Sequence, residues 1–168
     1  MKKILKLSSV LSWINLIAGF LFVFGGLLVT MVSPGIPAIL LSIVLPGAVI
    51  LHSFAAFQLR KSILNPALPL NHQAPAGLRL MGFMALFFSI MSFSNGLILW
   101  QQAPEAAKHV KLPPEAKDMN LVPFLRGSAV FILLISLGIA LNVVLNFRLL
   151  KWYLFYNHKD QQKNGEEP

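Results

Sequence analysis

Five polar side chains lie inside stretches of the chain that are otherwise apolar, and their chemistry is the first question the sequence raises. They are Asn15, His52, Ser53, Asn142 and Asn146. If the apolar stretches cross a membrane in alternating directions, all five residues fall in the same third of its thickness. Amide, hydroxyl and imidazole groups gathered at one depth can line a small cavity for a ligand, a lipid headgroup or an ion.

The same polar cluster also has a purely structural interpretation. Serine, asparagine and histidine side chains hydrogen-bond between helices in a membrane, where each bond contributes roughly 1 kcal/mol. Asn142 and Asn146 are four residues apart and therefore share one face of a helix. The sequence leaves both interpretations open, a binding cluster or a set of contacts that hold helices together.

Catalytic and cofactor chemistry lacks the residues that it needs. The chain contains no cysteine, and all six acidic residues lie outside the apolar stretches. His52 has no second histidine at membrane depth, which disfavours haem or metal ligation. It also has no acid there to orient it for nucleophilic catalysis. We therefore expect no catalytic residues, no metal, no cofactor and no enzymatic activity.

Four long apolar stretches must position the polar side chains. Only 12% of the residues are charged, against roughly 25% in a soluble domain. Each stretch can cross the ~30 Å hydrocarbon core as a helix. The expected helices cover 8–32, 38–59, 78–100 and 127–156. The predicted fold is an all-α membrane protein, a bundle of four transmembrane helices arranged as antiparallel hairpins.

The helices are expected to form one domain over residues 1–157. Prolines and charges mark the long outer loop at 101–125, and the tail at 158–168 is polar enough to be disordered. Pro46-Gly47 predicts a kink inside the second helix.

Small residues form stripes along the first and third predicted helices. Lipid is as apolar as leucine, so membrane helices associate by close backbone approach along such stripes. The stripe residues are Gly19, Gly26, Gly82, Ala85, Ser89, Ser92 and Gly96. We expect the helix at 78–100 to be the one around which the others pack. The two stripes should contact each other or a second copy of the chain.

Basic residues predict the orientation in the membrane. Ten of the 14 lysines and arginines would lie on the side that carries both termini, and the other four on the side of the outer loop. The positive-inside rule places both termini in the cytoplasm, in keeping with a bacterial inner-membrane protein. The net charge of +8 is thus a topology signal. No base-stacking or groove-reading motif accompanies it, so we expect no nucleic-acid partner.

Packing stripes together with an uncharged membrane interior favour a non-catalytic protein. It would be an accessory or assembly subunit of a larger membrane complex, or a homo-oligomeric scaffold. The alternative is a carrier or channel for a small molecule, lipid or ion that uses the polar cluster in the cytoplasmic third. The expected partners are the lipid bilayer and other membrane subunits, or further copies of the chain.

Overall fold

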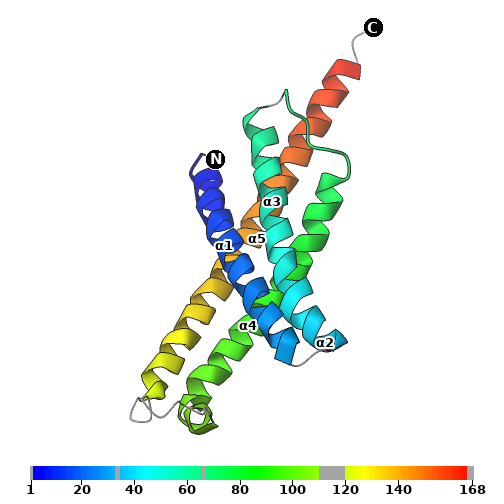
Figure 1. Ribbon diagram of the computed structural model, residues 1–168. Coiled ribbons are helices and arrows are strands. Elements are labelled where there is room, and N and C mark those ends of the chain that lie inside the picture. The colour runs from blue at the N-terminus through cyan, green and yellow to red at the C-terminus, as the bar shows by residue number, and fades with distance from the viewer. Residues whose placement is uncertain (1, 33–34, 66, 110–119, 166–168) are drawn as a thin grey trace.

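The computed structural model describes residues 2–32, 35–65, 67–109 and 120–165, and all regular secondary structure in them is helical. Its elements are α1 (Lys2–Val32), α2 (Ile36–Ile39), the π-helical η1 (Leu40–Val44), α3 (Leu45–Leu64), α4 (Ala74–His109) and α5 (Leu121–Gly165). The described chain has four helices that are long and apolar enough to cross a membrane (Figure 1). The predicted all-α bundle with four candidate membrane spans is confirmed.

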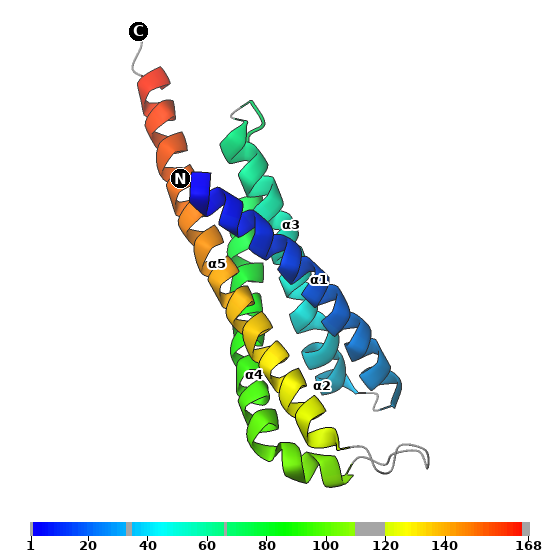
Figure 2. The ribbon, with the colours of Figure 1, turned by 90° about the vertical axis from the view of Figure 1, so that its left-hand side faces the viewer.

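Consecutive spans run in opposite directions. The start of α1 and the last turns of α5 lie at one end of the bundle, here called the terminal end (Figure 1). The end of α1, with α2, and the end of α4 lie at the opposite end, called the loop end. Toward the loop end, α1 and α2 separate from α4 and α5, so that the two hairpins diverge (Figure 2).

Neighbouring helices pack around the bundle in the order α1, α3, α4, α5 and back to α1, and the interface between α4 and α5 is the most extensive. The backbones of α1 and α4 do not approach each other closely within the described residues, and these two helices meet through the side chains of Phe22 and Phe88. The expectation that the two stripes meet within one chain is therefore wrong, because Gly26 faces Ser42 of the second span and Gly96 faces Leu133 of α5. In a bundle of alternating spans the first and third helices occupy diagonal corners, which keeps them apart.

The helical segment before α3 is irregular because of a proline. Pro46 has no N–H, so the carbonyl of Ser42 cannot receive the usual helical hydrogen bond. The chain widens into η1 at this point, where the Leu45 N–H bonds to the Leu40 carbonyl. Gly26 of α1 packs directly on the Ser42 carbonyl, and a Cβ at Gly26 would overlap that oxygen.

Several helix ends differ from their predicted positions. Helix α1 begins at Lys2, α3 continues to Leu64, and α5 begins at Leu121. The predicted outer loop is helical as far as His109, because Pro104 leaves only one carbonyl unpaired and α4 continues through it. The predicted disordered tail is helical over 158–165, since α5 contains no proline or glycine between Gly138 and Gly165. Residues 110–119 of the loop and 166–168 of the tail lie outside the described residues.

Two apolar clusters form the core along the bundle. The first lies toward the terminal end and includes Leu59, Leu78 and Leu150. The second includes Val49 and Ile139. Large apolar side chains cover the outside of all four spans, as expected for helices that face lipid. His52 and Asn146 of the candidate site lie between these two clusters along α3 and α5.

Candidate functional site

Two serines of α1 are hydrogen-bonded to two asparagines of α5. Ser8 Oγ donates to Asn146 Oδ1 at 2.7 Å, and Ser12 Oγ donates to Asn142 Oδ1 at 3.1 Å. All four side chains are fully buried. Because α1 and α5 run in opposite directions, residues spaced by four on each helix meet turn by turn.

His52 joins α3 to the other helices of the site. Its Nδ1 lies 3.2 Å from the Leu78 carbonyl on α4, and its Nε2 lies 3.4 Å from Asn146 Nδ2 on α5. A carbonyl can only accept, so Nδ1 carries the proton and Nε2 accepts from the amide. Asn146 Nδ2 also donates to Asn142 Oδ1 at 3.1 Å. The resulting polar network consists of Ser8, Ser12, His52, Asn142 and Asn146, and it ties all four spans together.

Asn15 and Ser53 belong to the predicted cluster but not to this network. Asn15 is buried one turn farther from the terminal end than Ser12. It lies beside Gly138 of α5, where a Cβ built on the glycine would be 3.8 Å from Asn15 Oδ1. Ser53 Oγ donates to the Val49 carbonyl of its own helix at 2.8 Å. Within the described chain, Asn15 Oδ1 and Asn142 Nδ2 are buried without a hydrogen-bond partner.

Sequence reasoning did not include Ser8 and Ser12 among the site residues. Both lie on the polar and small stripe of α1 that continues through Asn15 and Gly19. That stripe was a usable signal. The pairing of this stripe with α5 could not be predicted from the sequence, because the register between two helices far apart in the sequence depends on the whole bundle.

The stripe on α4 faces α5 and α3. Its five members are all buried. Ser89 Oγ donates to the Ser136 carbonyl of α5 at 2.7 Å. A Cβ at Gly82 would lie 2.5 Å from the Phe147 ring and 3.1 Å from His52 Cε1. Close contact along this stripe therefore lies within one chain.

The stripe on α1 faces the second span. A Cβ at Gly19 would lie 2.7 Å from the Ile50 side chain and 3.5 Å from the Pro46 carbonyl, and Gly26 packs on Ser42 as described above. Each of the two stripes is thus covered by a neighbouring helix.

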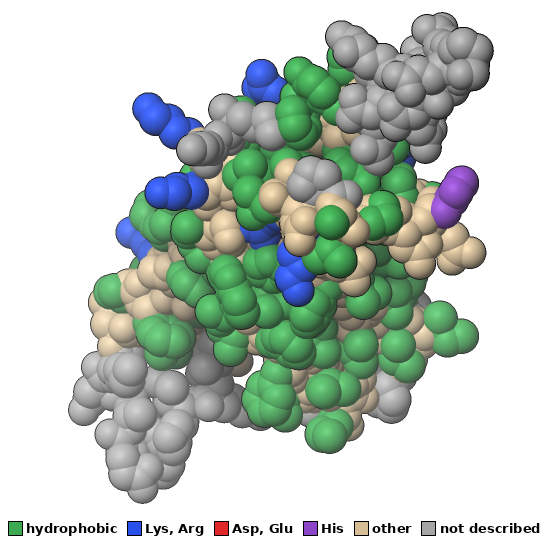
Figure 3. Space-filling view, turned by 90° about the horizontal axis from the view of Figure 1, so that it is seen from above, with side chains coloured by type: hydrophobic (Ala, Val, Ile, Leu, Met, Phe, Trp, Pro, Cys, Tyr) green, Lys and Arg blue, Asp and Glu red, His purple; other side chains and the backbone are tan. Residues whose placement is uncertain are grey.

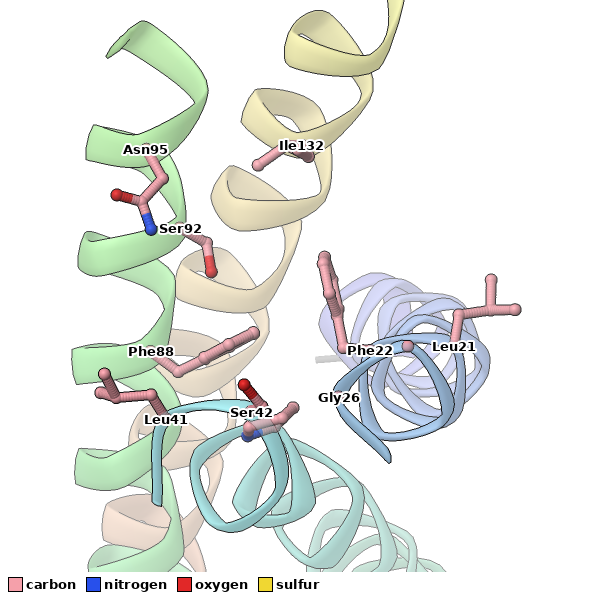
Figure 4. Close-up of a pocket in the computed structure, with 11 residues that line it drawn as sticks. Leu21, Phe22, Gly26, Leu41, Ser42, Phe88, Ser92, Asn95 and Ile132 are labelled. Atoms are coloured by element: carbon pink, nitrogen blue, oxygen red, sulfur yellow. The ribbon is translucent and has the colours of Figure 1, made fainter. Parts of the chain in front are cut away.

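A cavity of about 400 Å³ lies between the diverging hairpins, toward the loop end. Figure 4 shows side chains from α1, η1, α4 and α5 around it. Its lining includes Leu21, Phe22, Gly25, Gly26, Leu41, Ser42, Pro46, Phe88, Ser92, Asn95 and Ile132. We call it the wedge cavity. It includes none of the polar side chains that the sequence singled out as a possible site.

The terminal end of the bundle is basic. Figure 3 looks onto this end and shows lysine and arginine side chains, with no described acidic side chain on that face. The exposed basic residues there are Lys3, Lys6, Lys61, Arg79, Arg148 and Lys151. Arg60 is buried instead. Its Nε donates to the Ala56 carbonyl at 3.3 Å, and its guanidinium lies 4.5 Å from the Phe57 ring centroid.

Comparison of the chain with protein-family models, with curated proteins and with solved structures finds no match. Within the described residues, no group of three or more histidine, aspartate or glutamate side chains could hold a metal ion. The geometry therefore defines a four-span integral membrane protein in which five buried polar side chains bind one another and several others bind backbone carbonyls.

Proposed function

We propose that this protein is a non-catalytic membrane protein that acts as an accessory or assembly subunit of a larger complex, or as a homo-oligomeric scaffold. The observation that carries the proposal is the polar network. Its hydrogen bonds run from α1 to α5 and from α3 to both α4 and α5, so they make one unit of four helices. Side chains that are bonded across helices in this way stabilise the bundle.

The covered stripes add to this argument. Since α1 and α4 both use their small residues against neighbours in the same chain, another subunit would meet the large apolar side chains on the outside of the spans. Phe83 and Phe131 are 64% and 56% exposed there, whereas Phe88 is 8% exposed. These exposed side chains are the surface on which a membrane partner would pack.

Photo-crosslinking in the protein's own membrane tests the proposal. A photoreactive phenylalanine analogue at Phe83 or Phe131 should give protein adducts, and the same analogue at the buried Phe88 is the matched control. Adducts of twice the chain mass indicate a homo-oligomer, and adducts with foreign chains indicate an accessory subunit. Lipid adducts alone at both exposed positions would refute the proposal.

The basic terminal end supports an orientation with both termini in the cytoplasm of a bacterial cell. Exposed lysines and arginines gather at that end, and the cytoplasmic leaflet carries the anionic lipids that attract them. At the loop end, Arg126 lies 5.6 Å from the Trp100 ring centroid. A tryptophan at this position suits the opposite membrane interface.

A carrier or channel is the second candidate, and one specific observation favours it. Asn15 Oδ1 accepts and Asn142 Nδ2 donates, and neither has a partner in the described chain. A small polar molecule between them would satisfy both atoms. Analysis of small molecules retained by the protein, with Asn15→Leu and Asn142→Leu as variants, tests this. Retention that is lost in both variants would favour the carrier, and no retained molecule would exclude it.

A further inference from the structure

We propose that the wedge cavity holds one acyl chain of a membrane phospholipid, with an ester group of that lipid beside Asn95. The proposal rests on the loop-end half of the bundle and is independent of the function proposed above. The volume of about 400 Å³ falls within the roughly 300–1,000 Å³ of small-molecule sites. The question is therefore what occupies the cavity in a bilayer.

The walls of the cavity identify hydrocarbon as the medium that reaches it. Phe22 and Phe88 pack edge to face with ring centroids 5.3 Å apart (Figure 4), and Leu21 and Ile132 are also among the lining residues. The lining comes from all four candidate spans. If the wedge cavity were empty inside the membrane, the side chains that line it would lose dispersion contacts. A lipid chain in the cavity restores these contacts.

Asn95 supplies the polar end of the site. It is exposed although it lies within a candidate span. Trp100 follows five residues later on α4, so Asn95 lies roughly 7.5 Å closer to the membrane centre than this interfacial residue. An amide just inside the interface can donate to an ester carbonyl of a lipid whose chain continues inward.

The chain itself leaves the space for this acyl chain. Gly25 lines the cavity, and a Cβ built on it would meet no atom within 4 Å. The adjacent Gly26 instead packs on Ser42. One glycine thus holds the two helices together while the other keeps the cavity open. A larger side chain at position 25 would fill the cavity without displacing a helix.

Native mass spectrometry in mild detergent, with one equivalent of a phosphatidylcholine added to delipidated protein, tests the proposal. Wild-type protein should retain one lipid, and G25L should reduce the lipid-bound fraction at least tenfold. G47L is the matched control, because a Cβ at Gly47 also meets no atom within 4 Å but Gly47 does not line the cavity. N95L should weaken retention, whereas S94L at the adjacent exposed position should not.

Quenching locates the lipid. Two single-cysteine variants carry a bimane label, L21C at the cavity and F20C next to it in the sequence. The two labels lie at nearly equal depth in the membrane, and the side chains they replace are similarly exposed, at 59% and 54%. A phosphatidylcholine with brominated chains, added at one equivalent in detergent, should quench the label at position 21 and spare the label at position 20. Equal quenching at both positions, or equal lipid retention by G25L and G47L, would overturn the proposal. If G25L fails to fold, the quenching pair alone decides.

Discussion

Replacement of Asn146 by leucine should lower the stability of the bundle more than any other single change in the polar network. Asn146 accepts from Ser8 at 2.7 Å, donates to Asn142 at 3.1 Å and lies 3.4 Å from His52 Nε2. Leucine has a similar branched shape but can form none of these bonds. It also leaves the Ser8 hydroxyl and the Nε2 atom of His52 without a partner.

The magnitude follows from the number of bonds lost. Side-chain hydrogen bonds between membrane helices contribute about 0.6 kcal/mol on average and up to about 1.7 kcal/mol each. Loss of all three should therefore lower the free energy of unfolding by about 2 kcal/mol, with about 5 kcal/mol as an upper bound. The single bond between Ser8 and Asn146 should appear as a coupling of roughly 0.6–1.7 kcal/mol.

A double-mutant cycle of Ser8→Ala and Asn146→Leu measures this coupling. Reversible unfolding by titration with a denaturing detergent, followed by far-ultraviolet circular dichroism, gives the free energies. Asn95→Leu is the matched control, since it makes the same exchange at an exposed asparagine and should leave stability unchanged. A coupling of zero, with Asn146→Leu as stable as the parent, would refute the idea that the network holds the helices together.

Three further predictions follow from the packing and the orientation. Gly26→Ala should lower stability by about 1–3 kcal/mol because its Cβ overlaps the Ser42 carbonyl, whereas Gly25→Ala should change it by less than about 1 kcal/mol; equal unfolding midpoints would contradict this. Gly82→Leu should separate α4 from α5 and lower the thermal midpoint in detergent, and an unchanged midpoint would contradict the close contact. The native chain has no cysteine, so a cysteine at Ala107 should react with an impermeant reagent outside the cell and one at Gln73 should not; the reverse pattern would invert the orientation.

The spans were predictable because a membrane imposes a simple requirement on the sequence. Uninterrupted apolar stretches without charge had to be helices, and the spacing of Gly82, Ser89 and Gly96 showed which face of the third span would be buried. The same spacing could not show what would cover that face. Each stripe meets a different neighbour, and the choice depends on how four helices share a cross-section.

The local irregularities were less predictable for a different reason. Pro46 indicated a break in helical bonding, but it did not indicate that the chain would respond with a π-helical segment that packs on Gly26 across the hairpin. Pro104 suggested the end of a helix, yet α4 continues through it to His109. Propensity rules indicate that a proline disfavours regular helical hydrogen bonding. They do not indicate whether the helix will end, bend or continue at that proline.

The polar cluster was partly predictable. Asn142 and Asn146 had to share a face, and His52 had to lie at a similar depth, so their proximity followed from helix geometry. Ser53 looked equivalent to His52 in depth but bonds to its own helix. The depth of a residue in the membrane does not determine which side of its helix the side chain points to. That direction decides whether a residue such as His52 joins the network or, like Ser53, bonds to its own helix.

The central claim, that the protein is a non-catalytic subunit or scaffold, is tested most directly by its intact mass after release from its own membrane in mild detergent. One chain has a mass of 18.6 kDa. We predict a larger particle that contains either foreign chains or several copies of this one. A particle of one chain without companions would contradict it and would direct attention to the two unpartnered amide atoms as a carrier site.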